Sequence, residues 1–398
     1  MKILVINAGS SSLKYQLIDM ETETPIAKGL CERIGIGGKI THKTSDGRSV
    51  SYEVDFPTHE EAFAELTKVL TTGDTAVIKN LDEISAIGHR VVQGGEKITQ
   101  SVLLTEDVLK VVDECAELAP LHNPPILVAI RACQKVFSDK IPQVGVFDTA
   151  FHQTMPQKAY TWAIPYEYYE KYHIRRYGYH GTSHRFVSGR LGELVGGLEG
   201  KKVVTCHLGN GSSICAIVDG KCMENSMGFT PLDGLIMGTR SGSVDPSVVA
   251  FIANKEGLSA QEVVDILNKK SGYLGVSGFT SDQRDLWDAA EKGNARAQLA
   301  LDMQVYQIKK YIGAYAAAMG GLDYVVFTGG IGENDMKVRE LVCSDMEFLG
   351  IKFAPEKNNF RGEERIISTD DSKVTVYVLP TNEELLIARD TAAIVGNK

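Results

Sequence analysis

A stretch near the start of the chain is echoed two hundred residues later. Residues 3–19 read ILVINAGSSSLKYQLID, and residues 203–220 read VVTCHLGNGSSICAIVDG. The two align without a gap at an offset of 200, which places Asn7 opposite His207. Each stretch reads as a buried strand, a Gly/Ser turn and a returning strand, the pattern of a β-hairpin. Because the offset is half the chain, duplication is favoured over chance likeness of two turns, and we predict a duplicated domain with a cleft between its halves.

The rest of the chain reads as α/β. Apolar runs bounded by turn signals recur at 144–150, 324–330 and 373–380, and a long helical pattern covers 288–319. Strands that alternate with helices are typical of the α/β class. A length of 398 residues favours two domains.

The domain boundaries follow from the repeat. We expect one domain over residues 1–150 and a second over residues 151–383. A closing helix, roughly 382–393, is expected to cross back to the first domain, so that residues 384–398 complete it.

Composition narrows the possible functions. A net charge of −9 argues against a general nucleic-acid or anionic membrane surface. No apolar run approaches the roughly 20 residues of a membrane span, and the first apolar run is too short for a signal peptide. The seven scattered cysteines contain no C-x-x-C pair, which fits reduced thiols rather than disulfides or a zinc site. We expect a cytoplasmic protein.

Three glycine-rich loops have the composition of phosphate sites. The turns Gly9–Ser12 and Gly209–Ser213 offer backbone N–H groups with little side-chain bulk. Lys14 would add an ammonium group, and Asn7 an amide for a metal ion or its water. The third loop, GGIGEN at 329–334, follows a predicted strand. Neither hairpin matches the P-loop and no loop completes G-x-G-x-x-G, so each alone reads as a tight turn.

Several cationic side chains lie among glycines instead of on helical faces. Arg90 and Arg240 in such turns are typical of anion binding, because a guanidinium holds a carboxylate or phosphate with two hydrogen bonds. His89 and His184 read equally well as buried, hydrogen-bonded histidines. Asp148 ends a predicted strand, where it is either a catalytic or metal-directed carboxylate or the cap of the next helix.

The longer motifs identify a family. VINAGSSSLK (5–14) and HLGNGSS (207–213) resemble the two signature motifs of the acetokinase family. Further blocks resemble that family in the expected order, namely HRVVQGG, HNPP, FDTAFH, YGYHGTSH, TPLDGLIMGTRSGSVDP, FTGGIGEN and PTNEE. The resemblance covers residues 2–393. It implies duplicated actin-like, ribonuclease H-like ATPase domains with the active site in the interdomain cleft.

The resemblance also implies an activity. The expected reaction is reversible transfer of the γ-phosphoryl group of ATP to acetate, giving acetyl phosphate and ADP with Mg²⁺, for which Mn²⁺ could substitute, in a homodimer. The nearest alternative is a propionate kinase of the same family. A chaperone-like or actin-like ATPase is a further alternative, but it would not need anion-binding arginines at Arg90 and Arg240. A phosphatase would need a carboxylate to activate water, a role that Asp148 could fill.

Residue roles carry over motif by motif. Arg90 is expected to bind the acyl carboxylate, and His180 and Arg240 to stabilise the transferring phosphoryl group, with His122 and Asp148 beside the reacting groups. The expected walls of the acyl pocket are Val92, Leu121 and Pro231. The expected nucleotide contacts are Ser10, Ser12, Lys14, His207, Leu208, Gly209, Asn210, Gly211, Asp282, Gln283, Arg284, Gly330, Ile331, Gly332, Glu333 and Asn334.

Physical chemistry refines two of these roles. The family casts Asp148 as an acid/base, but a carboxylate substrate is already ionised at pH 7, so we expect Asp148 to order Mg²⁺, its waters or Arg240. Asn7 and a glutamate of PTNEE are expected to hold Mg²⁺. TNEE reads as a capping box from Thr381 to Glu384, which leaves Glu383 as the expected metal ligand.

Two positions depart from the family pattern. Gln93 stands where histidine is common, and Tyr179 where phenylalanine is common. Tyr179 would put a hydroxyl group near the acyl pocket. We expect a small apolar pocket that fits a methyl group and also admits propionate more slowly.

Overall fold

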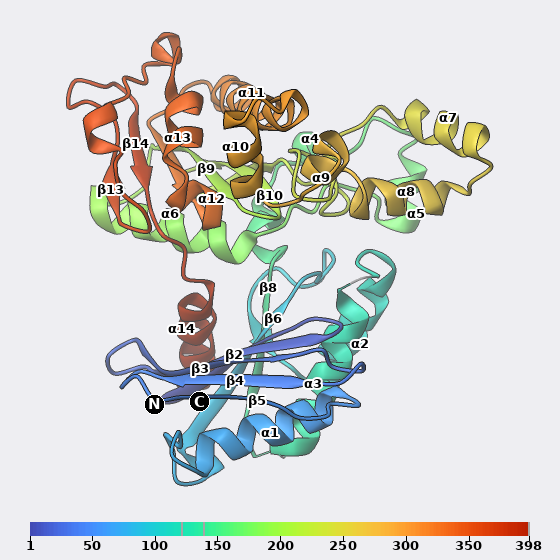
Figure 1. Ribbon diagram of the computed structural model, residues 1–398, viewed down its shortest axis with the longest axis vertical. Coiled ribbons are helices and arrows are strands. Elements are labelled where there is room, and N and C mark those ends of the chain that lie inside the picture. The colour runs from blue at the N-terminus through green and yellow to red at the C-terminus, as the bar shows by residue number, and fades with distance from the viewer. Residues whose placement is uncertain (121, 138–139, 397–398) are drawn as a thin grey trace. The chain divides into compact units, whose positions relative to one another are not determined.

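The structure is a computed structural model that describes residues 1–120, 122–137 and 140–396. The chain divides into two compact units (Figure 1). Unit 1 comprises Met1–Phe151 and Asn382–Lys398, and unit 2 comprises His152–Thr381. Leu121, an expected wall of the acyl pocket, lies outside the described residues.

Unit 1 is built on an eight-stranded sheet with the order β5-β4-β3-β2-β1-β6-β8-β7. Its strands are β1 (Lys2–Ala8), β2 (Ser12–Asp19), β3 (Thr24–Glu32), β4 (Lys39–Thr44), β5 (Ser49–Glu53), β6 (Ile84–Val91), β7 (Val102–Leu103) and β8 (Gln143–Phe147). Its helices are α1 (His59–Thr71), α2 (Glu106–Glu114), α3 (Asn123–Phe137) and α14 (Glu383–Gly396).

Side-chain alternation along β1 divides the core of unit 1 between the two faces of this sheet. Leu4 and Ile6 pack in the cluster that contains residues of α1 and α3. Ile3 and Val5 pack in a second cluster that contains Ile387 of α14. Because successive strand residues point to opposite faces, one apolar strand supplies both cores. The last helix of the chain thus completes the fold of the first unit.

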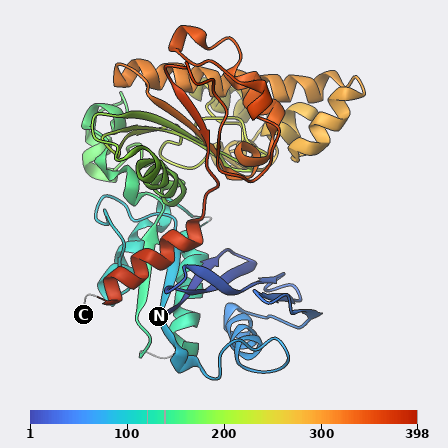
Figure 2. The same ribbon diagram turned by 90° about the vertical axis from the view of Figure 1, so that its left-hand side faces the viewer.

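Unit 2 contains a six-stranded sheet with the order β11-β10-β9-β12-β14-β13. Its strands are β9 (Lys202–Leu208), β10 (Ser212–Val218), β11 (Lys221–Asn225), β12 (Tyr324–Thr328), β13 (Arg365–Ile366) and β14 (Thr375–Val378). Its helices are α4 (Gln157–Tyr160), α5 (Glu167–Tyr172), α6 (Gly181–Val195), α7 (Pro246–Glu256), α8 (Ala260–Lys269), α9 (Gly272–Ser277), α10 (Gln283–Glu291), α11 (Ala295–Met319), α12 (Gly329–Asn334) and α13 (Met336–Cys343). Figure 2 shows α6 on one side of this sheet and α11 on the other.

The central strands of the two units share one topology. In unit 1, β1 pairs antiparallel with β2 and parallel with β6, and β6 pairs parallel with β8. In unit 2, β9 pairs antiparallel with β10 and parallel with β12, and β12 pairs parallel with β14. The duplicated α/β fold expected from the repeat is therefore confirmed.

The gapless alignment holds only for the first strand of each hairpin. Ala8 pairs with Leu13, whereas Leu208 pairs with Ser212. The second turn is thus one residue shorter, and the returning strands are shifted by one position. As a result Ser213, and not the residue aligned with Lys14, pairs with His207.

Two local expectations need correction. The helical pattern over 288–319 is two helices, α10 and α11, because Gly293 adopts a left-handed φ of 88° between them. The predicted loop GGIGEN is itself the short helix α12. Among the described helices, none combines the length and apolar character that a bilayer span requires.

Candidate active site

In unit 1 three predicted site residues follow or end neighbouring strands at one edge of the sheet. Asn7 lies near the end of β1, Arg90 near the end of β6, and Asp148 directly after β8. These three strands are parallel, so their carboxyl ends meet at the same edge. The strand register therefore brings together residues that are more than fifty positions apart in the chain.

Arg90 and Asp148 form a partly buried ion pair, in which Asp148 is buried and Arg90 is partly exposed. Arg90 Nε donates to Asp148 Oδ1 at 3.1 Å, and Arg90 Nη2 donates to Asp148 Oδ2 at 2.7 Å. Glu383 Oε2 lies 3.8 Å from Arg90 Nε. The carboxylate of Asp148 raises the pKa of Arg90, while burial raises the pKa of Glu383. Arg90 thus carries a fixed positive charge held in one orientation.

The start of α14 differs from the sequence prediction. Asn382, not Thr381, caps the helix, because the backbone N–H of Leu385 donates to Asn382 Oδ1 at 3.0 Å. Thr381 belongs to unit 2, where its N–H donates to Glu333 Oε1 and its hydroxyl accepts from Ser183. The capping box from Thr381 to Glu384 is therefore wrong, and with it goes the reason for preferring Glu383 as metal ligand.

A cavity of about 330 Å³ in unit 1 is lined by Asn7, Lys14 and Glu384. Lys28 and Lys43 also line it, from β3 and β4. The cavity therefore combines an amide and a carboxylate oxygen donor with ammonium groups. That donor set suits a hard divalent cation bound together with phosphate oxygens.

The remaining predicted site residues of unit 1 lie in different parts of the unit. Ser10 and Ser12 lie in the first hairpin, where Gly9 N donates to Ser12 O at 2.8 Å. His122 directly precedes α3, and Val92 is buried after β6. Gln93, one of the departures from the family pattern, is buried and accepts from the N–H of Gly95.

In unit 2 a hydrogen-bonded chain of side chains orients His180. His184 bonds to Thr205 Oγ1 through Nδ1 and to Ser213 Oγ through Nε2, and Ser213 Oγ lies 2.8 Å from His180 Nδ1. Burial, with neighbouring histidines, lowers the pKa of His184 well below its usual value. His184 is thus a neutral, buried positioning group, and His89, bonded to Gln143, is likewise buried.

Arg240 lies beside His180 at the second hairpin. A side chain added at Gly211 would place its Cβ 3.2 Å from His180 Nε2 and 3.6 Å from Arg240 Nη1. Arg240 Nη1 also donates to the carbonyl of Pro231 at 3.3 Å. Burial lowers the pKa of Arg240, yet a guanidinium stays protonated at neutral pH. The two side chains predicted to bind the phosphoryl group therefore lie together next to Gly211, which has no side chain.

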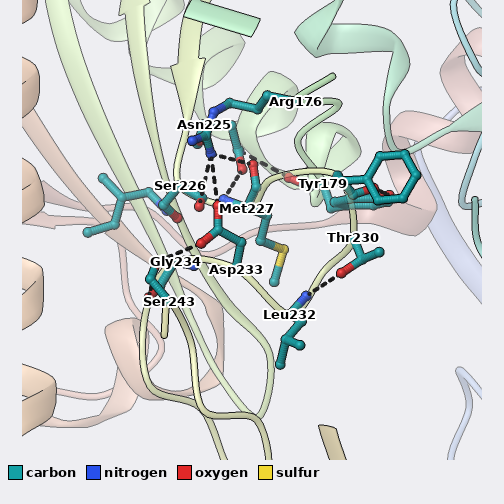
Figure 3. Close-up of polar contacts among 12 residues, drawn as sticks. Arg176, Tyr179, Asn225, Ser226, Met227, Thr230, Leu232, Asp233, Gly234 and Ser243 are labelled. Atoms are coloured by element: carbon teal, nitrogen blue, oxygen red, sulfur yellow. Dashed lines mark hydrogen bonds and ion pairs between the residues drawn. The ribbon is translucent and has the colours of Figure 1, made fainter. Parts of the chain in front are cut away.

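The loop that carries Pro231 is held by Arg176. Figure 3 shows the Arg176 guanidinium pointing at the backbone where β11 ends, and Nη1 donates there to the carbonyls of Asn225, Ser226 and Met227. Arg176 is therefore a structural group and not a site cation. The Tyr179 hydroxyl donates to the Phe229 carbonyl at 2.7 Å, so it fixes the same loop.

A second cavity, of about 650 Å³, lies in unit 2 between the second hairpin, α10 and α12. The predicted nucleotide residues that line it are Gly209, Asn210, Asp282, Gln283, Arg284, Gly330, Ile331 and Asn334. The sequence reading missed other lining residues, namely Tyr273, Trp287, Asp288, Glu291, Asp335, Met336, Lys337 and Arg361. The ring of Trp287 offers an aromatic surface, and its Nε1 donates to Asp335 Oδ2 at 2.7 Å.

Other predicted nucleotide residues support the fold around this cavity. Leu208 and Gly332 are buried, with Gly332 packed against Phe327. Glu333 Oε1 accepts from the backbone N–H groups of Gly329 and Thr381, so it joins the ends of two segments. The His207 ring packs against the His180 ring in a tilted arrangement, with ring centroids 4.3 Å apart.

Comparisons with known proteins agree along the whole chain. A family model described as the acetokinase family matches residues 2–389. The acetate kinase of Carboxydothermus hydrogenoformans is 57% identical over 400 residues and covers 100% of both chains. The crystal structure of Porphyromonas gingivalis acetate kinase has a TM-score of 0.95 and 50% identity, covering 99% of both chains.

A crystal structure of a propionate kinase from Francisella tularensis is also similar, with a TM-score of 0.92 and 42% identity over 99% of both chains. Full-length identity of this order, together with the duplicated fold, assigns the chain to one family. The chain belongs to the acetokinase family and is a kinase.

Proposed function

We propose that this kinase catalyses the reversible, Mg²⁺-dependent transfer of the γ-phosphoryl group of ATP to acetate, giving acetyl phosphate and ADP. The main support for the proposal is that the side chains of His180 and Arg240 both lie next to Gly211, which has no side chain of its own. An imidazole and a guanidinium beside a glycine backbone can together bind a phosphoryl group. Acetate is proposed as the acceptor because similar proteins are named acetate kinase.

Arg90 is proposed to bind the acetate carboxylate. Its Nε and Nη2 hold Asp148, and no described residue accepts a hydrogen bond from Nη1. Val92, Leu121 and Pro231 are proposed as the walls around the methyl group. Because the acceptor is already an anion at pH 7, no proton has to leave it, and Asp148 acts by orienting Arg90.

Repulsion between acetate and the γ-phosphoryl group is the main obstacle to this reaction. Arg90, Arg240 and Lys14 each bring a positive charge to one of the reacting anions in this proposal. Phosphoryl transfer depends mainly on positioning and charge neutralisation, so these cations supply most of the catalysis.

Mg²⁺ is proposed to be held by Asn7 and Glu384, which line the same cavity of unit 1. Mg²⁺ in kinases is bound by one or two protein oxygens together with phosphates and waters, and this pair fits that set. When bound, the ion neutralises charge on the phosphate oxygens. The proposal replaces Glu383, because Glu383 lies beside Arg90 and the capping argument that favoured it is wrong.

A homodimer is also proposed. Unit 2 exposes large apolar side chains on the segment that contains α5 and on α7, namely Ile164, Tyr166, Tyr168, Tyr172, Val248 and Phe251. Exposed apolar surface of this kind is typical of subunit interfaces. Light scattering of the purified chain tests the mass, and a monomer at micromolar concentration would contradict the proposal.

The acceptor is tested by trapping the acyl phosphate with hydroxylamine in the presence of ATP and Mg²⁺. Acetate should give a higher kcat/KM than propionate, by about 1–3 kcal/mol or roughly 10–200-fold, the usual value of one methylene. Preference for propionate would instead favour the second candidate, a propionate kinase, to which the similar Francisella structure points. ATP hydrolysis without hydroxamate would contradict both.

A further inference from the structure

A cluster of soft donors lies in unit 2 outside the groups assigned to phosphoryl transfer. His152 Nδ1 lies 3.1 Å from Cys222 Sγ, and Cys222 Sγ lies 3.5 Å from Cys215 Sγ. All three ligand atoms are within 4.8 Å of one another, and all three side chains are buried. We propose that His152, Cys215 and Cys222 form a binding site for Zn²⁺.

The orientation of the histidine suits a metal ligand. His152 Nε2 lies 2.9 Å from the carbonyl oxygen of Tyr179, which can only accept, so Nε2 carries the proton. The unprotonated Nδ1 therefore faces Cys222 Sγ, 3.1 Å away, with Cys215 Sγ next to that sulfur. A metal-bound histidine typically donates its other N–H to a carbonyl or carboxylate in this way.

The spacing of the donors also fits. The three ligand atoms form a triangle with sides of 3.1 Å, 3.5 Å and at most 4.8 Å. A point equidistant from the three atoms lies roughly 2 Å from each of them, close to the lengths of Zn–N and Zn–S bonds. Three protein ligands leave a fourth position of a tetrahedral zinc ion to a water or another small ligand.

Charge selects the kind of ion. Zn²⁺ would displace one proton from each thiol, so two thiolates and one divalent cation give a neutral group. A neutral group is the least costly to bury, whereas a monovalent ion would leave a net negative charge. Mg²⁺ is excluded by ligand chemistry, because it prefers oxygen donors to thiolates.

A bound ion would stabilise the backbone next to His180. The Tyr179 carbonyl accepts both from His152 and from Asn225 Nδ2, at 3.2 Å. The next residue, His180, has a left-handed φ of 56°. An ion that fixes the His152 ring would therefore stabilise a strained backbone segment, independently of which acyl group the enzyme uses.

The test is the cation content of the full chain. The protein is expressed with added Zn²⁺, or with Cd²⁺ as an optical probe, and purified in excess Mg²⁺. We expect about one ion per chain by mass spectrometry, with a thiolate-to-cadmium absorption band in the ultraviolet. Cys222→Ala and Cys215→Ala should each lower the content at least tenfold, whereas Cys343→Ala, which removes a buried free thiol elsewhere in unit 2, should not.

Circular dichroism shows that each variant is folded before its content is compared. Metal-free wild type, or equal content in Cys222→Ala, overturns the proposal. A disulfide between Cys215 and Cys222 in protein that takes up no cation would also overturn it, and would make the pair a redox couple instead.

Discussion

Arg90 and Asp148 lie at the ends of the neighbouring parallel strands β6 and β8 and share two hydrogen bonds, of 3.1 Å and 2.7 Å. Both carboxylate oxygens of Asp148 are thereby engaged by one guanidinium. The orientation of Arg90 depends on this carboxylate, so the two residues act as a unit in the proposed acetate site.

Asp148→Asn should weaken the binding of acetate through Arg90. The amide keeps the shape but presents an N–H group where an oxygen accepted. We expect kcat/KM for acetate to fall roughly 10–100-fold, the value of a hydrogen bond to a charged group. The fall should almost vanish when Asp148→Asn is made in an Arg90→Ala background, because the effect passes through Arg90.

The control for this cycle is Glu114→Gln, which breaks the exposed pair with Lys97 in the same unit. Exposed pairs contribute little, so its kcat/KM should stay within about twofold of wild type. An equal loss from Asp148→Asn in both backgrounds would contradict the positioning role and restore a direct one.

Arg240→Ala should lower kcat by about 10²–10³-fold while nucleotide affinity changes by much less. The guanidinium lies at Gly211 beside His180, where the proposed transfer would develop charge, and removal of one such donor has effects of this size. Single-turnover rates and ADP binding by calorimetry separate the two quantities. Arg190→Ala, on the surface of the same unit, is the control. An unchanged kcat would remove Arg240 from the transition state.

Much of the fold could be predicted from local pattern. The hairpins at Asn7 and His207 and the strand at Tyr324–Thr328 have apolar runs that end in turn residues, which are local signals. The one-residue slip of β10 could not be predicted, because turn length is set by backbone hydrogen bonds that the aligned letters do not encode.

The grouping of candidate site residues could be predicted where a sequence motif contains them, and it was missed where only tertiary packing brings them together. Arg240 and His180 lie in long motifs, and the structure places them together. Trp287 lines the unit 2 cavity from the middle of an amphipathic helix, where an apolar residue reads as core. Cys215, Cys222 and His152 come from separate elements, so no spacing rule could join them.

Gly211→Ala should impair transfer without unfolding the protein. Its added Cβ would come within 3.2 Å of His180 Nε2, so the imidazole must give way slightly. We expect kcat to fall about tenfold or more, since small misplacements of reacting groups have large effects. Gly189→Ala in α6, where an added Cβ has no neighbour within 4 Å, should leave kcat unchanged. Loss of thermal stability in Gly211→Ala with normal kcat would contradict this prediction.

Acid should destabilise the enzyme partly through His89. Burial lowers the pKa of His89 to about 4, below its value of about 6.5 in the unfolded chain. Between these values the unfolded state binds more protons, so stability falls as the pH drops below about 6.5 and is independent of this group above it.

Urea unfolding followed by circular dichroism tests the effect. His89→Gln should lose about 2 kcal/mol less than wild type between pH 7 and pH 5. His173→Asn, at an exposed histidine, should match wild type. Equal losses in wild type and His89→Gln would contradict the assignment.

Adjacent glutamates at the start of α14 offer the sharpest test of the proposed metal site. Glu384 lines a cavity with Asn7, whereas Glu383 lies 3.8 Å from Arg90. Glu384→Gln should therefore raise the Mg²⁺ concentration for half-maximal activity by tenfold or more, since loss of supporting groups alone reduces metal affinity about 10–100-fold. Glu383→Gln should change mainly the KM for acetate. Mn²⁺ binding by electron paramagnetic resonance, measured with ADP and no acetate, gives the affinity without turnover. If Glu383→Gln weakens Mn²⁺ and Glu384→Gln does not, the carboxylate ligand is Glu383, and Arg90 shares its partner with the metal ion.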